Sequence, residues 1–335
     1  FTQKVVREDP VLGFFHTWIT QLSKKYDSIE VICLEKGDFD LPKNVTVYSL
    51  GKESGASRLK YIFNLYKYLF LIRGSYDRVF VHMNQEYVIL AGLYWKIIGI
   101  PVYMWRNHRK GDFLTKIAVY FCVKTFCTST SSFVARFEKN VIMPVGNDTN
   151  FFQPIPGVVR KKHSICMLGR IAPVKHIELA LESVNYLVKS GEQVSLTIIG
   201  SALPRDEKYF ESLKKYIIDN NLTSYISMLG EVPFSKHPEV FSGYEISLNL
   251  TESGSFDKTI LGSTSCGAIP LVSNASLKGI LPSICLTKDS PEEIANSLKN
   301  LLNPAEQVKI QDDLKKFVES QSLHTLIERI IFEIK

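Results

Sequence analysis

Short runs of β-branched and apolar residues alternate along this chain with longer segments in which apolar residues recur every three to four positions. The short runs have the length of buried strands, and the longer segments have the period of amphipathic helices. Strands separated by helices pair in parallel, because each crossover returns the chain to the same end of the sheet. The pattern predicts an α/β fold with parallel strands at 29–34, 45–49, 78–82, 102–105, 125–128, 141–144, 163–168, 195–199, 226–229, 245–250 and 269–273.

A turn-rich segment at 145–157 interrupts this alternation, and three basic residues follow it at 160–162. Such a composition is typical of an interdomain linker. The length of 335 residues is also about twice that of a common single domain. We therefore expect two Rossmann-like halves that face each other across a cleft, with ligands at the carboxyl ends of the strands.

Composition narrows the class of protein. A hydrophobic fraction of 45% and a mean hydropathy of +0.02 exclude a disordered, collagen-like or polytopic membrane protein. The formal charge of +6 is unevenly distributed, because residues 1–155 carry +7 and residues 156–335 carry −1. The first half is thus expected to meet an anionic partner.

The cysteines indicate where the protein is located, and the first residues bear on how the chain begins. The six cysteines lack the spacing of a zinc site, which predicts buried reduced thiols and a cytoplasmic location. Residues 1–5 are interpreted as the end of a strand that begins earlier, so we expect the true N-terminus to be missing. No nucleic-acid partner is expected.

Two segments in the second half carry candidate chemistry. The strand at 163–168 leads through Gly169 and Arg170 to Lys175, at the start of a helix predicted to end near residue 189. Two cations beside a helix N-terminus suit a diphosphate, although a solvated loop pair is the alternative. In the second segment, 252–267, Gly and Ser residues precede a short helix and leave backbone N–H groups free for an anion. Lys258 adds a positive charge there, and Asp257 is either a ligand or the ordinary partner of the helix dipole.

These residues and their order resemble the GT-B glycosyltransferases of family 4, the retaining, glycogen-synthase-like group 1 enzymes. Gly169-Arg170 with Lys175 is similar to the Gly-Arg-x4-Lys diphosphate clamp of that family. Residues 197–200 and 229–232 resemble the strand-turn elements that frame the nucleotide, and 145–152 resembles the end of the first domain. The resemblance implies an acceptor-side domain at 1–152, a donor-binding domain at 153–318, and a helix at 319–335 that crosses back to the first domain.

The resemblance further implies a hexosyltransferase that moves a sugar, with retention, from a UDP- or GDP-sugar to a glycan or lipid-linked acceptor of cell-envelope or polysaccharide type. No metal or other cofactor is expected. Arg170 and Lys175 would stabilise the departing diphosphate, and His108, after the strand at 102–105, would contact the sugar. His82, at the end of a neighbouring strand, is a second histidine candidate. The implied donor-binding positions are Gly13, Gly169, Gly200, Glu231, Val232, Glu252, Gly254, Ser255, Phe256, Asp257, Lys258, Thr259 and Gly262.

The chain departs from this family at a pair of glutamates in the donor site. The family usually carries a Glu-x7-Glu pair, whose first Glu lies near the donor sugar and whose second Glu holds the ribose, and here both positions are glycine, Gly254 and Gly262. We therefore expect weaker nucleotide binding or an altered donor pose. A nucleotide-sugar-binding protein with weak or no catalysis is the alternative.

Two rival classes have less support. Asp38-Phe39-Asp40 mimics the metal-binding Asp-x-Asp of GT-A transferases, but it has no supporting carboxylate cluster. A nicotinamide dehydrogenase needs Gly-x-Gly-x-x-Gly after its first strand, and the chain lacks it.

A helix at 58–73 explains part of the positive charge, with Arg58, Lys60, Lys67 and Arg73 interspersed among two apolar stripes. One interpretation wedges the helix between the sheet and a neighbouring helix. The other lets it enter the interface of an anionic membrane, as a peripheral contact on the cytoplasmic face. The stripes are Leu59, Ile62, Phe63, Tyr66, Leu69 and Phe70, and Tyr61, Leu65, Tyr68 and Ile72.

Overall fold

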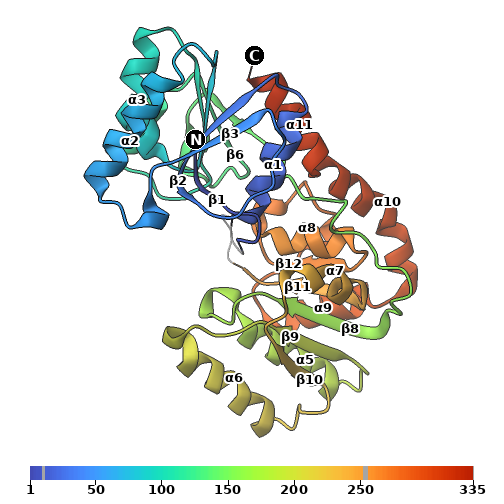
Figure 1. The fold of residues 1–335 in the computed structure, drawn as a ribbon. Helices are drawn as coiled ribbons and strands as arrows, with labels where there is room; N and C mark the ends of the chain where they lie inside the picture. The colour runs from blue at the N-terminus through green and yellow to red at the C-terminus, as the bar shows by residue number, and fades with distance from the viewer. Residues whose placement is uncertain (10–11, 252–255, 335) are drawn as a thin grey trace. The chain divides into compact units, whose positions relative to one another are not determined.

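The structure, a computed structural model, describes residues 1–9, 12–251 and 256–334 (Figure 1). The chain forms two compact units, one made of Phe1–Met143 with the segment from Leu326 onward, and the other of Pro144–Thr325. Every strand pairing within the named sheets is parallel. The α/β class predicted from the alternating pattern is therefore confirmed.

The first unit holds seven strands among the described residues. Its sheets have the orders β1-β2-β3 and β4-β5-β6-β7. Phe1 connects them, because its amino group donates to the Phe80 carbonyl at 2.7 Å and its carbonyl accepts from the His82 N–H at 2.8 Å. The combined order β3-β2-β1-β4-β5-β6-β7 is that of a Rossmann sheet. The strands are β1 (Thr2–Val5), β2 (Ile29–Lys36), β3 (Val45–Ser49), β4 (Val79–His82), β5 (Val102–Trp105), β6 (Lys124–Cys127) and β7 (Asn140–Ile142).

Helices cover both faces of this sheet. Right-handed crossovers place α1 (Gly13–Ser23) on one face, and α2 (Arg58–Leu71), α3 (Gln85–Ile97) and α4 (Phe113–Phe121) on the other. Figure 1 shows α2 and α3 side by side, and α1 next to α11 (Leu323–Glu333). The core between sheet and helices is fully buried and includes Trp18, Leu65, Leu69, Trp95 and Met104.

The second unit has one five-stranded sheet in the order β10-β9-β8-β11-β12. The chain runs outward from β8 to β9 and β10 and then returns to β11 on the other side of β8. The order therefore reverses between β8 and β11, which is where ligands bind in open parallel sheets. The elements are β8 (Lys161–Leu168), α5 (Ile177–Lys189), β9 (Ser195–Ile199), α6 (Glu207–Asp219), β10 (Ile226–Gly230), α7 (His237–Ser242), β11 (Tyr244–Asn249), α8 (Lys258–Ser265), β12 (Ile269–Val272), α9 (Pro291–Leu301) and α10 (Pro304–Ser320).

The two units join at positions that differ from the sequence expectation. We expected the first domain to end at residue 152, whereas the structure divides the chain after Met143. Residues 144–152 belong to the second unit because Asn147 Nδ2 donates to Ser265 Oγ at 2.8 Å and the Phe152 ring lies against α8.

The chain passes from the second unit back to the first within α11. We expected the returning helix to span 319–335, but α10 continues to Ser320 and the first unit takes up the chain only at Leu326. The distal part of α11 is fixed there by Glu333, whose carboxylate accepts from Lys124 Nζ at 2.7 Å, and by Glu328, which pairs with Lys25 at 2.8 Å.

Candidate functional site

The reversal point of the second sheet is occupied by an ion pair. Lys175, at the end of the loop after β8, donates to Asp257 Oδ2 at 2.5 Å and to Thr251 Oγ1 at 3.1 Å. Asp257 is the N-cap of α8, where its other oxygen accepts from the Thr259 N–H at 3.0 Å and the Thr259 hydroxyl at 2.9 Å. The pair therefore ties the loop after β8 to the first turn of α8.

The environment keeps this pair charged. The Asp257 side chain is only 14% exposed. Burial would raise the pKa of its carboxyl, but the Lys175 ammonium together with bonds from Asn249 and Thr259 outweighs burial and lowers the pKa from 3.8 to about 2. The Asp257 carboxylate is thus an anion at the N-terminus of α8, as the helix dipole favours, and it holds the Lys175 ammonium at the same point.

Three strand-end loops lie against one another beside the pair. The Gly169 N–H donates to the Ile199 carbonyl at 2.9 Å, and the Gly200 N–H donates to the Gly230 carbonyl at 2.8 Å. Gly200 has φ +144°, and a Cβ there would lie 1.9 Å from the Gly169 carbonyl oxygen. Only glycine permits this approach. Arg170 follows Gly169 and has an exposed side chain, so a planar cation is presented at the same edge.

Gly200→Ala is expected to lower the free energy of unfolding by about 3 kcal/mol or more, because it adds a backbone collision to a strained φ. The melting temperature of the second unit should fall by roughly 6 °C or more. Gly191→Ala is the matched control, since its φ is +84° and no atom lies within 4 Å of the added Cβ. Equal losses in the two variants, measured by calorimetry, would show that the loops are not packed this closely.

The expected nucleotide-framing residues lie on the next loop. Glu231 is exposed and accepts from Ser201 Oγ at 3.1 Å, while the Val232 carbonyl lies 3.2 Å from His237 Nε2. Burial lowers the pKa of His237. Both expected residues thus border the edge that carries Gly169 and Gly200.

Gly262, where the family usually has glutamate, is buried against an aromatic ring. A Cβ at Gly262 would lie 3.0 to 3.2 Å from three ring atoms of Phe152. Phe152 in turn packs edge to face on Phe234 at 5.7 Å, and Phe234 stacks on Phe151 at 4.9 Å. A phenyl ring therefore occupies the space next to the missing carboxylate. This aromatic cluster was not predicted, although the two adjacent phenylalanines Phe151 and Phe152 in a turn-rich linker were a signal for it.

The remaining predicted donor-binding residues have different surroundings in the structure. Thr259 and Asp257 belong to the hydrogen-bond network, and Lys258 has an exposed side chain beside them. Phe256 packs instead over Phe317, with parallel rings 6.2 Å apart. Glu252, Gly254 and Ser255 lie outside the described residues.

The candidates in the first unit lie at the carboxyl edge of its own sheet. Gly13 begins α1 so close to the Arg7 carbonyl that a Cβ would lie 2.7 Å from its oxygen. His108 follows β5, is exposed, and accepts from the Lys110 N–H at 3.1 Å. His82 is 1% exposed and stacks on Phe15 at 4.0 Å, so it is a core residue and is removed as a candidate.

Among residues 1–9, 12–251 and 256–334, no three His, Cys, Asp or Glu side chains gather so as to hold a metal ion. Asp40 of the Asp-x-Asp sequence uses its backbone N–H to donate to His16 Nε2 at 3.1 Å, and its carboxylate lies 3.7 Å from Arg7.

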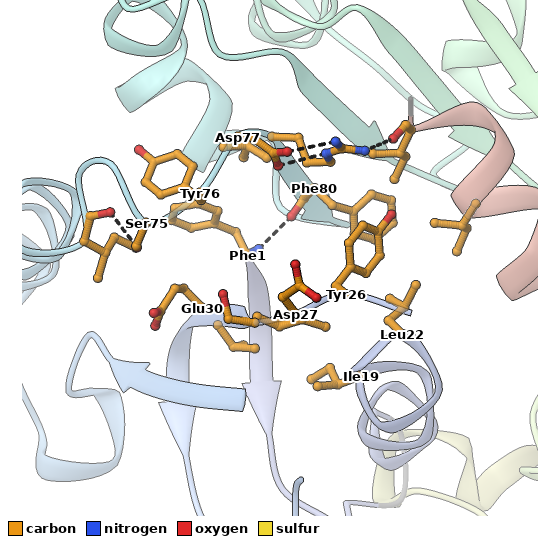
Figure 2. A pocket seen from close by; sticks show the side chains of 18 of the residues that line it. Phe1, Ile19, Leu22, Tyr26, Asp27, Glu30, Ser75, Tyr76, Asp77 and Phe80 are labelled. Atoms are coloured by element: carbon orange, nitrogen blue, oxygen red, sulfur yellow. Dashed lines mark hydrogen bonds and ion pairs between the residues drawn. The ribbon is translucent and has the colours of Figure 1, made fainter. Parts of the chain in front are cut away.

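A cavity of about 460 Å³ lies inside the first unit, bounded by β2, β4, α1 and α11 (Figure 2). It adjoins the amino ends of the strands, whereas ligands of parallel sheets bind at the carboxyl ends. Two carboxylates on its lining, Asp27 and Glu30, disfavour a diphosphate, and a third, Asp77, is paired with Arg78 at 2.9 Å. The cavity lies beside Phe1, between the first residues of β2 and β4.

Comparison with known proteins agrees with this geometry. The family model described as glycosyl transferases group 1 matches residues 148–316, half of the chain, and the chain belongs to that family. No curated protein sequence matches the chain.

Solved structures share the whole fold at low sequence identity. HepE (Alr3699) of Anabaena in complex with UDP has a TM-score of 0.77 and 15% identity, over 99% of this chain and 98% of that chain. A glycosyltransferase from Rickettsia africae has a TM-score of 0.75 and 13% identity, over 99% and 96%. WaaG, a glycosyltransferase involved in lipopolysaccharide biosynthesis, has a TM-score of 0.65 and 12% identity, over 100% and 99%. The predicted GT-B architecture of two Rossmann-like domains is thereby confirmed, and the chain is a group 1 glycosyltransferase.

Proposed function

We propose that this protein is a retaining, metal-independent glycosyltransferase of family 4 that uses a nucleotide-diphosphate sugar. The observation that carries the proposal is the Lys175–Asp257 pair, set at the reversal point of the donor-side sheet and at the N-terminus of α8. Arg170 and Lys175 line one small hollow together with Gly169 and Thr251. We place the diphosphate between these two cations.

In the proposed reaction, negative charge develops on the departing diphosphate. The bond between the anomeric carbon and the phosphate oxygen breaks, and a bond to the acceptor hydroxyl oxygen forms on the same face of the sugar. The acceptor proton passes to the departing phosphate oxygen. Arg170, Lys175 and the amides of α8 stabilise the growing negative charge. His108 orients the sugar and is not required as a base.

The substrates are proposed at the level of chemical class. A UDP- or GDP-sugar is supported by the solved complexes of HepE with UDP and with UDP-glucose. A glycan or lipid-linked acceptor is supported by the positive charge of the first unit and by the role of WaaG in lipopolysaccharide biosynthesis. We place the reaction in the cytoplasm, at the membrane face.

A thermal-shift screen of nucleoside diphosphates and their sugars tests the donor assignment. A ligand at a hundred times its dissociation constant stabilises the folded protein by about 2.7 kcal/mol, which corresponds to a rise of roughly 5 to 10 °C in melting temperature. UDP- or GDP-sugars should produce this rise, and adenosine monophosphate should not. Equal responses to all nucleotides, or none, would contradict the proposal.

The packing of Phe152 on Gly262 favours a second candidate, a nucleotide-sugar-binding protein without catalysis. Both candidates bind the donor, so binding does not separate them. Release of the nucleoside diphosphate from the stabilising sugar nucleotide, with and without pooled glycan and lipid acceptors, does. Turnover identifies the enzyme, and binding with no turnover identifies the binding protein.

A further inference from the structure

Helix α2 turns the stripe of Tyr61, Leu65, Tyr68 and Ile72 inward and exposes the other stripe except for Leu69. Leu65 and Leu69 are 1% exposed and pack into the core. Leu59, Phe63 and Phe70, at spacings of four and seven, all face solvent, and Leu59 is 79% exposed. The wedged arrangement expected from the sequence therefore accounts for only half of the helix.

The neighbouring helices extend this exposed stripe. Tyr66 of α2 donates its hydroxyl to the Leu90 carbonyl of α3 at 2.6 Å, and Lys96 of α3 donates to the Tyr120 hydroxyl of α4 at 2.7 Å. The three helices thus lie side by side and present one continuous face. Its exposed apolar side chains, which we name the α2–α4 surface, are Leu59, Ile62, Phe63, Tyr66, Phe70, Leu71, Leu90, Leu93, Ile97, Phe113, Leu114 and Tyr120.

The concentration of apolar side chains is unusual for a monomer. More than half of the large hydrophobic residues that are exposed in the described part of the chain lie between residues 59 and 123. Ile97 is 75% exposed and Phe113 is 73% exposed. Single exposed hydrophobics are ordinary, but a contiguous group marks a surface that binds something.

The charge of the same segment indicates what it binds. The three helices carry five basic residues and one acidic residue, Glu86, a net charge of +4; the basic residues are Arg58, Lys60, Lys67, Lys96 and Lys116. Lys60 lies over the Phe63 ring at 5.0 Å and Lys96 over the Tyr120 ring at 4.2 Å. In both contacts the ammonium group lies over the face of an aromatic ring, so positive charge and apolar side chains share this surface.

We propose that the α2–α4 surface binds an anionic lipid bilayer, with its apolar side chains in the interface and its lysines on the lipid phosphates. Phospholipid headgroups complement the charge of +4 that the three helices carry, whereas a second copy of this chain would bring two such charges together. No helix among the described residues is both long enough and apolar enough to cross a bilayer.

This placement has a consequence that rests on the proposed function. Phe113 and Leu114 begin α4, a few residues after His108 at the carboxyl edge of the first sheet. A bilayer on the α2–α4 surface therefore lies next to the acceptor-side residues. A lipid-linked acceptor would stay in the membrane while its headgroup reaches His108.

Vesicle flotation of the full chain tests the proposal. The protein should float with vesicles of phosphatidylcholine and phosphatidylglycerol about tenfold more than with phosphatidylcholine alone, and high salt should weaken this binding. The triple variant Phe63→Ser/Phe70→Ser/Ile97→Ser should lose about tenfold. Ile218→Ser/Val308→Ser, which removes exposed apolar side chains from the second unit, should float like the parent.

Three results would overturn it. In the first, the parent binds neither kind of vesicle. In the second, the triple variant floats as well as the parent. In the third, light scattering shows that the parent is a dimer and the triple variant a monomer. Melting temperature and donor-induced thermal shift should be unchanged in the triple variant, which shows that it is folded. Since those readouts use only the donor side, failure of donor binding remains distinguishable from failure of membrane binding.

Discussion

Lys175→Ala is expected to lower glycosyl transfer at least about a hundredfold, the order of loss seen when one preorganised donor to a developing negative charge is removed. It also leaves the Asp257 carboxylate largely buried without its cation. That should cost on the order of 3 kcal/mol of folding stability, or roughly 5 to 10 °C in melting temperature. Lys189→Ala, which removes an exposed lysine at the other end of α5, should change neither quantity.

A second variant separates the chemical role of Lys175 from its structural one. Asp257→Asn breaks the same ion pair but keeps the ammonium beside the phosphate site. We expect a similar loss of stability with transfer within about tenfold of the parent, because the cation that faces the diphosphate remains. Steady-state kinetics of both variants, measured below their melting temperatures, distinguish the chemical role of Lys175 from its structural role. If both lose transfer equally, the pair is structural and Lys175 is not part of a diphosphate clamp.

The stability difference between parent and Asp257→Asn should depend on pH. The pKa of Asp257 is lowered in the folded protein from 3.8 to about 2, so its ionised form stabilises the fold at all pH values above about 4. This contribution is lost as the pH falls toward 2, and it amounts to roughly 2 kcal/mol. Urea unfolding at pH 6 and pH 2.5 measures it, and a difference that does not change with pH contradicts the assignment.

The elements of this fold were predictable, because strands buried on both faces leave continuous apolar runs. The run predicted at 245–250 is β11, Tyr244–Asn249, and the helix expected to follow Lys175 ends at Lys189, as predicted. The pattern could not tell which stripe of α2 faces the core. That depends on the residues that the sheet and α3 place opposite it, and those contacts come from distant parts of the chain.

The pairings of the candidate site residues were not predictable from the sequence. Lys175 and Asp257 were both named from local motifs, and Asp257 was expected to be either a donor ligand or the partner of the helix dipole. In the structure it caps α8 and also holds Lys175 from 82 positions away. Gly262 was visible in the sequence as a departure from the family, but the ring that packs against it was not. Phe152 approaches it from across the sequence, and no local rule predicts such a contact.

Gly262→Glu is expected to destabilise the protein by about 3 kcal/mol or more, because it pushes a charged side chain against a buried ring. The new Cβ would lie 3.0 Å from Phe152 Cε1, and Gly262 is itself buried in α8. Gly262→Ala is the control for the helix itself. Its gain in helix propensity, about 1 kcal/mol, should nearly offset the tight contact of one methyl group. Thermal unfolding of the two variants beside the parent measures both effects.

Phe152→Ala makes room for the carboxylate and turns the same position into a test of nucleotide recognition. In the double variant Phe152→Ala/Gly262→Glu, part of the stability lost in Gly262→Glu should return, with a coupling of about 1 to 3 kcal/mol between the two sites. If the glutamate of relatives holds the ribose at this point, the double variant should bind UDP or GDP more than twofold tighter than Phe152→Ala by calorimetry. Affinities that agree within twofold would show that the phenyl ring has not replaced a ribose contact, and that this enzyme recognises its nucleoside through other groups.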